Sequence, residues 1–196
     1  MNKKVQELVS QIMALEKELK AELEKEEVKV PFTIEKGKVW FDKEILQRQK
    51  AALIDVYHYI KSSNFLYILT APIIYAVVIP ALFLDLFVTI YQTINFRVYK
   101  IPLVKRSDYI IFDRQYLGYL NFIEKLNCLY CSYFNGLMAY AGEVAARTEQ
   151  FWCPIKHAKK IAYRHRYYDK FVSYGDEHYH EKLEELRKEL QEQYKG

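Results

Sequence analysis

Three cysteines and one histidine are the residues of this sequence whose types and spacing most clearly suggest chemistry. Cys128 and Cys131 are three residues apart and Cys153 precedes His157 by four, so each pair would share one face of a helix. Two antiparallel helices would bring these faces together. Thiolate and imidazole groups suit zinc, and a Cys3His set completes a tetrahedral structural site. The spacing predicts a zinc site, with an iron–sulfur cluster as the alternative.

The same cysteines also fit interpretations without a metal. Cysteine is among the most often buried residue types, so all three can be core residues. Two neighbouring thiols can also form a redox pair. An odd number of cysteines, in a chain whose first 27 residues contain no apolar leader, argues against a disulfide framework.

Four charged residues lie close in sequence to the cysteines and could support a metal site through hydrogen bonds: Glu124, Glu143, Arg147 and Glu149. Glu143 and Arg147 are four residues apart, which is also the spacing of an ordinary ion pair on one helix. These four residues therefore fit either a site or the packing of helices.

Residues 64–96 are the most apolar part of the chain, and Asp85 is their only charged residue. This stretch exceeds the roughly 20 residues that a helix needs to cross a bilayer. We expect a single tilted span over about 65–88 or a re-entrant hairpin bent at Ile79-Pro80; the core helix of a soluble protein is the remaining alternative. An ionisable group at membrane depth is a functional candidate, and a downstream Lys or Arg is its expected partner.

Basic residues flank the apolar stretch on both sides. This places the part of the chain after residue 97 on the cytoplasmic side of a bacterial inner membrane. The net charge of +4 does not require nucleic acid and fits an anionic lipid surface. Residues 158–168, AKKIAYRHRYY, interleave basic and aromatic side chains, which favours an anionic leaflet; RNA is the weaker interpretation because no RNA-recognition module accompanies them.

The patterns predict a mostly α fold: a membrane-anchored helical bundle with a small N-terminal β-hairpin and charged terminal helices. The chain divides into a coiled-coil-like helix at 1–27, a hairpin and helix at 28–63, the membrane segment at 64–96, a cytoplasmic helical domain at 97–175 and a charged C-terminal helix at 176–196.

Some element boundaries follow from caps and breakers. One helix is expected from Asp42 to about residue 63, a second from about 113 to 150, and a third from Pro154 to about 174. The terminal helices each carry a leucine seam. This predicts either that they pair with each other or that the chain self-associates or binds a helical partner.

Four short motifs carry a resemblance: EKLNC at 124–128, YC at 130–131, ARTEQ at 146–150 and WCPIKH at 152–157. Together with the apolar stretch before them, they resemble a family of uncharacterised bacterial membrane-associated proteins. The resemblance covers about half of the chain. It implies a bacterial, membrane-bound setting, and it assigns no activity because none is established for that family.

The sequence therefore favours a non-enzymatic protein, and it contains no Gly-x-Ser-x-Gly motif and no Gly-rich phosphate loop. We predict a membrane-anchored scaffold or accessory protein with structural zinc at the four ligands. The alternatives are an inner-membrane redox component with an iron–sulfur centre and a metal-free structural helical module. Membrane lipid is the expected partner, and nucleic acid is not.

Overall fold

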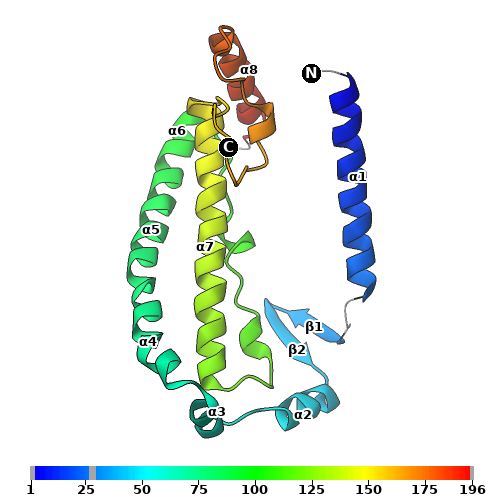
Figure 1. The fold of residues 1–196 in the computed structure, drawn as a ribbon, viewed down its shortest axis with the longest axis vertical. Coiled ribbons are helices and arrows are strands. Elements are labelled where there is room, and N and C mark those ends of the chain that lie inside the picture. Colours follow the sequence, from blue (N-terminus) through cyan, green and yellow to red (C-terminus); the bar gives the residue numbers. More distant parts are fainter. Residues whose placement is uncertain (1–2, 27–29, 195–196) are drawn as a thin grey trace. The chain divides into compact units, whose positions relative to one another are not determined.

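The computed structural model describes residues 3–26 and 30–194. The chain forms two compact units that divide after Leu46. The predicted mostly α class is confirmed, since helices make up most of the elements (Figure 1).

The first unit contains helix α1 (Lys3–Glu26) and an antiparallel hairpin of strands β1 (Phe32–Glu35) and β2 (Lys38–Phe41). The hairpin turn is Lys36-Gly37, and both residues have positive φ (51° and 76°), the geometry of a two-residue type I′ turn. The predicted hairpin is confirmed, although its first residues, 28 and 29, lie outside the described residues.

Helix α1 confirms the predicted N-terminal helix. The described side chains of its predicted seam, Leu8, Ile12, Leu15 and Leu19, are each about half exposed or more. The side chain of Val5, which belongs to the same seam, lies outside the described residues. Pairing of this seam with a second helix or a second copy stays a prediction.

The chain continues through helices, with short turns between some of them. In order these are α2 (Lys43–Ala51), α3 (Val56–Ser62), α4 (Phe65–Ala76), α5 (Val78–Tyr91), the π-helical η1 (Gln92–Phe96), α6 (Arg97–Tyr99), the 3-10 turns η2 (Arg106–Asp108) and η3 (Arg114–Tyr116), α7 (Phe122–Trp152), the 3-10 turn η4 (Tyr168–Lys170) and α8 (Tyr179–Glu192).

The helix predicted from Asp42 to residue 63 is wrong, because the chain breaks into α2 and α3. Asp55 lies in the break, and its carboxylate accepts hydrogen bonds from the backbone N–H groups of Tyr57 (3.0 Å) and His58 (3.1 Å). This side chain caps a new helix, so the first helix does not continue through it.

Helices α4 and α5, together with η1 and α6, form one curved column beside α7 (Figure 1). The column is interrupted only at Val77, where Pro80 has no N–H group for the carbonyl of Ala76. The chain does not turn back at Pro80. The predicted re-entrant hairpin is therefore wrong in this structure, and a single helix covers Phe65–Tyr99.

Helix α7 begins later than the predicted residue 113. Asn121 and Glu124 form a capping box: the Asn121 side chain accepts from the backbone N–H groups of Ile123 and Glu124, and the Glu124 carboxylate accepts from the N–H of Asn121. Upstream, the N–H of Gly118 donates to the side chain of Gln49 (2.9 Å) instead of to a helical carbonyl.

The segment 100–121, called the linker here, has mostly irregular backbone and packs along α7. Gly136 allows this approach, since a Cβ there would lie 2.5 Å from the carbonyl oxygen of Tyr109. The buried amide of Gln92 bonds both the N–H (2.9 Å) and the C=O (3.0 Å) of Val104 and donates to the hydroxyl of Tyr140 (2.7 Å). The linker is thus fixed against the core between α5 and α7.

The helix predicted from Pro154 to about 174 is wrong. Lys156 and Val172 are joined by a backbone hydrogen bond, and the N–H of Val172 donates to the carbonyl of Pro154 (both 2.8 Å). A helix here would place Lys156, Lys159 and Lys160 on one face, which like-charge repulsion disfavours. We call residues 153–178 the basic loop.

Helix α8 confirms the predicted C-terminal helix. Its leucine seam, Leu183, Leu186 and Leu190, is buried, and the helix packs against α7. The leucine seam of α8 therefore packs against α7, inside the second unit.

Candidate functional site

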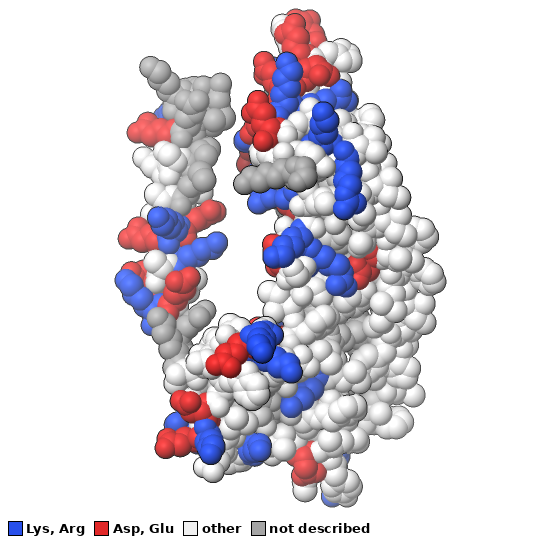
Figure 2. All heavy atoms as spheres, turned by 180° about the vertical axis from the view of Figure 1, so that it is seen from behind, with Lys and Arg blue, Asp and Glu red and all other residues white. Residues whose placement is uncertain are grey.

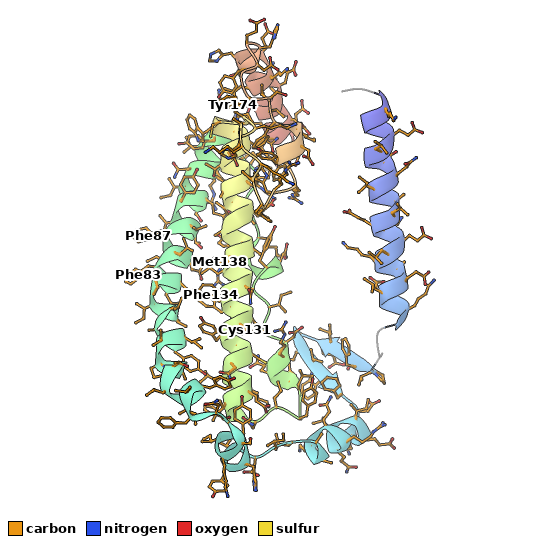
Figure 3. All side chains as sticks on the ribbon, in the orientation of Figure 1. Phe83, Phe87, Cys131, Phe134, Met138 and Tyr174 are labelled. Atoms are coloured by element: carbon orange, nitrogen blue, oxygen red, sulfur yellow. The ribbon has the colours of Figure 1, made fainter. Side chains whose placement is uncertain are left out.

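Helix α7 separates the four predicted metal ligands into two groups. Cys128 and Cys131 lie in its first third, Cys153 immediately follows its last residue, and His157 lies in the basic loop. At a rise of 1.5 Å per residue, continuous helix holds Cys131 and Cys153 about 33 Å apart. Figure 3 shows Cys131 far from the end of α7 that leads into the basic loop.

The four side chains lie too far apart to share one ion in this structure. The prediction that two antiparallel helices bring them together is wrong, because the one helix that carries Cys128 and Cys131, α7, continues up to Cys153. Within residues 3–26 and 30–194, no group of three or more His, Cys, Asp or Glu side chains could hold a metal. Binding of zinc or an iron–sulfur cluster stays a prediction without an assembled site.

The three thiols are free and differ in exposure. Cys128 is half-buried, whereas Cys131 and Cys153 are exposed. Partial burial, together with the nearby carboxylate of Glu149, raises the pKa of the Cys153 thiol above its ordinary value. Since the thiolate is the nucleophile and the metal ligand, a raised pKa makes Cys153 less suited to either role at neutral pH.

Glu143 is the centre of a polar cluster on α7. Its side chain is only 10% exposed, and its Oε1 accepts hydrogen bonds from Arg147 Nε (2.9 Å), Arg166 and the hydroxyl of Tyr167 (2.7 Å). Burial raises the pKa of Glu143, but the bonds from Tyr167 and Arg147 outweigh burial and leave the pKa below its ordinary value. The predicted Glu143–Arg147 ion pair is confirmed.

This cluster holds three segments together. Arg147 also donates to the carbonyl of Pro102 in the linker (2.6 Å), while Arg166 and Tyr167 come from the basic loop. Six residues after Glu143 on α7, the carboxylate of Glu149 lies 3.0 Å from a ring nitrogen of His165. These carboxylates therefore fix the linker and the basic loop on α7, and the remaining predicted carboxylate, Glu124, caps the helix.

Asp85 is neutralised inside the second unit. Arg106 donates to both of its carboxylate oxygens, with Nε at 2.9 Å from Oδ1, and the hydroxyl of Tyr133 donates to Oδ2 (3.0 Å). The Asp85 side chain is 13% exposed. The predicted downstream basic partner is thereby confirmed, and its place in the linker makes the pair a structural contact between α5 and the linker.

The outer side of α4 and α5 is an exposed apolar surface. Phe83, Leu86 and Phe87 are 59%, 53% and 65% exposed, and Figure 3 shows Phe83 and Phe87 on the side of α5 away from α7. In the view of Figure 2, the charged side chains gather over other elements and the edge formed by α4 and α5 carries none. We call this surface the outer face.

An apolar groove of about 580 Å³ lies between α3, α4 and α7. Its walls include Tyr67, Ile74, Leu126 and Cys131, and the hydroxyl of Tyr75 donates to the side-chain oxygen of Asn127 across it. Cys131 therefore lies on the wall of an apolar groove whose lining includes none of the other predicted metal ligands.

Comparison with protein-family models, with curated proteins and with solved structures finds no match.

Sequence reasoning missed the contacts that the basic loop makes with α7. Arg166, Tyr167 and His165 were grouped with a lipid-facing or RNA-facing segment, yet all three bond to Glu143 or Glu149. Their partners are 16 to 24 residues away in sequence. No local periodicity links residues at such distances, so the pattern contained no signal for this pairing.

Proposed function

We propose that this chain is a membrane-anchored scaffold or accessory protein whose anchor is the outer face of α4 and α5. The observation that carries the proposal is the helix Phe65–Tyr99, which is long and apolar enough to cross a membrane while only 6% of its most apolar window is buried. The core helix of a soluble protein would be mostly buried. Contiguous exposed apolar side chains of this extent favour contact with hydrocarbon.

The surroundings of the helix favour an orientation along the membrane surface over a crossing. Arg106 contacts Asp85, and Val104 contacts Gln92, so the linker runs beside the second half of the helix. The linker has irregular backbone and carries the exposed charges of Lys105 and Asp108. Lipid-exposed irregular backbone does not occur in the hydrocarbon layer, and each charged side chain at its centre costs about 2.5–3.5 kcal/mol.

A crossing through the first half of the helix meets a similar obstacle. The Tyr75–Asn127 contact puts Glu124 and Lys125 of α7 close to the depth of α4. A helix lying in one leaflet avoids both costs, because only its outer face enters the hydrocarbon while α7 and the linker stay at the interface. We therefore propose a helix that lies in the membrane plane.

The proposed location is the cytoplasmic face of a bacterial inner membrane, with lipid as the main partner. Basic residues on both sides of the apolar stretch and the resemblance to bacterial membrane-associated proteins support this location. The exposed leucine seam of α1 supports a second contact, with another copy of the chain or a helical partner. Metal binding stays a separate prediction.

Cell fractionation of the full chain tests the anchor. The triple variant Phe83→Ser, Leu86→Ser, Phe87→Ser should leave the membrane fraction for the soluble fraction. The matched control changes three exposed apolar residues of the linker to serine: Leu103, Ile111 and Phe112. The control should stay with the membrane. Circular dichroism in detergent checks that both variants fold, and equal retention of both variants, or a soluble parent chain, contradicts the proposal.

A further inference from the structure

Basic side chains converge on a hollow of about 270 Å³ in the basic loop. The charged and imidazole groups around it are Lys156, His157, Lys159, Lys160, Arg164 and Asp169. Four basic side chains and one carboxylate therefore surround the hollow. The excess of positive charge around the hollow attracts an anion.

Most of these cations lack an anionic partner in the part of the chain that the structure describes. Arg164 approaches Asp169 at 3.7 Å, a long contact between two exposed side chains. Lys156, Lys159 and Lys160 make no ion pair within the described residues. Three uncompensated ammonium groups around one hollow favour a multiply charged ligand over a single carboxylate.

The floor of the hollow is fixed by the fold. Tyr168 is 5% exposed, and its hydroxyl accepts a hydrogen bond from the backbone N–H of His157 (2.7 Å). The guanidinium of Arg164 lies 5.6 Å from the centre of the Tyr168 ring. The backbone bonds between Pro154, Lys156 and Val172 close the loop, and the Glu143 cluster ties it to α7. The backbone around the hollow is thus held in place by the fold, while Lys159 and Lys160 are exposed side chains beside it.

We propose that this hollow binds a phosphate group, presented either by an anionic lipid headgroup or by a free phosphate compound. A phosphate carries several strong acceptor oxygens, which suit three ammonium groups and one guanidinium fork. The lipid source rests on the proposed membrane function, whereas the free source does not. A hollow of this size holds a phosphate group and leaves the apolar part of the ligand outside.

Two binding assays on the full chain test the site and separate the two sources. The first measures inorganic phosphate by calorimetry in detergent, and the second measures binding to vesicles of phosphatidylcholine with and without phosphatidylglycerol. The test variant is Lys159→Glu with Lys160→Glu. The control is Lys50→Glu with Lys188→Glu, which changes the net charge equally at exposed lysines outside the hollow.

The test variant should bind about tenfold more weakly or worse, because each basic residue near an anionic surface contributes about a fivefold change in affinity. The control should change binding by less than about threefold. Loss in the vesicle assay alone assigns the site to a lipid headgroup, and loss in the calorimetric assay assigns it to free phosphate. Equal losses in test and control, or no phosphate-dependent binding by the parent chain in either assay, overturn the site.

A failure of the membrane proposal would give a different result in these two assays. The parent chain would then bind neither kind of vesicle while inorganic phosphate binding and its sensitivity to Lys159 and Lys160 remained.

Discussion

Helices α7 and α5 of the second unit differ in how far they bury their apolar side chains. Helix α7 buries Leu137, Tyr140 and Val144, which are 0–3% exposed. Helix α5 leaves Phe83 and Phe87 well over half exposed. Helix α5 is therefore the more apolar helix and also the less buried one. The hydropathy of a helix indicates that its side chains must leave water, but it does not indicate whether protein or lipid covers them.

The carboxylates of α7 and α5 extend this comparison. The carboxylates of α7 are bonded to the linker and the basic loop through Arg147, Arg166 and His165. The single carboxylate of α5, Asp85, is turned into the protein and bonded to Arg106. The side chains that α5 exposes are therefore all apolar, as a lipid-facing surface requires.

Truncating one large apolar side chain on each helix should give the largest difference in stability. Leu137→Ala should lower the free energy of unfolding by about 2–5 kcal/mol, because it opens a cavity in the core. Phe83→Ala on the outer face should change it by less than about 0.5 kcal/mol in detergent, where no protein packing is lost. Denaturant unfolding followed by circular dichroism measures both free energies of unfolding. Similar losses in the two variants would contradict the difference in burial between α7 and α5.

A pair of glycines on α7 tests whether this helix is packed tightly against the linker. In Gly136→Ala the new Cβ would meet backbone atoms of Tyr109 and Ile110 at 2.5 and 2.9 Å, so we expect a loss of about 1–3 kcal/mol. Gly142 has no such neighbours within 4 Å, and Gly142→Ala should stabilise the chain by about 0.5–1 kcal/mol. Thermal unfolding of the two variants should show shifts of opposite sign.

The Glu143 cluster should make stability depend on acid. Because the folded-state pKa of Glu143 is lowered, its stabilising contribution is present above the ordinary pKa of about 4.3 and is lost as pH falls through the lower folded value. The parent chain should therefore lose more stability than Glu143→Gln between pH 6 and about pH 3. The difference should be smaller than the core effects, and parallel pH profiles would mean that this carboxylate carries no net stabilisation.

The sequence was informative where a local pattern decides the structure. The Lys36-Gly37 turn specifies the hairpin, the uncharged run around Asp85 specifies a long apolar helix, and the four-residue spacing of Glu143 and Arg147 specifies an ion pair. Each of these depends on residues that are neighbours in sequence.

It was uninformative where distant segments meet. The spacing of Cys128 and Cys131 correctly places them one helical turn apart, but it does not say which element faces them, and Cys153 proved to lie at the other end of the same helix. The start of α7 was readable in principle, since Asn121 followed three residues later by Glu124 is the pattern of a capping box. The fold of the basic loop depends on contacts with α7 that no local pattern records.

The depth of the outer face in a bilayer tests the central claim most directly. Nitroxide labels at Leu69, Phe83 and Ile94, all about 60% exposed, would be introduced one at a time after the three native cysteines are changed to serine. Relaxation by oxygen and by a water-soluble nickel complex gives the depth of each label. A helix lying in the membrane plane gives similar shallow depths at all three positions. A deep central label between shallow outer ones, or three labels open to water, would contradict it.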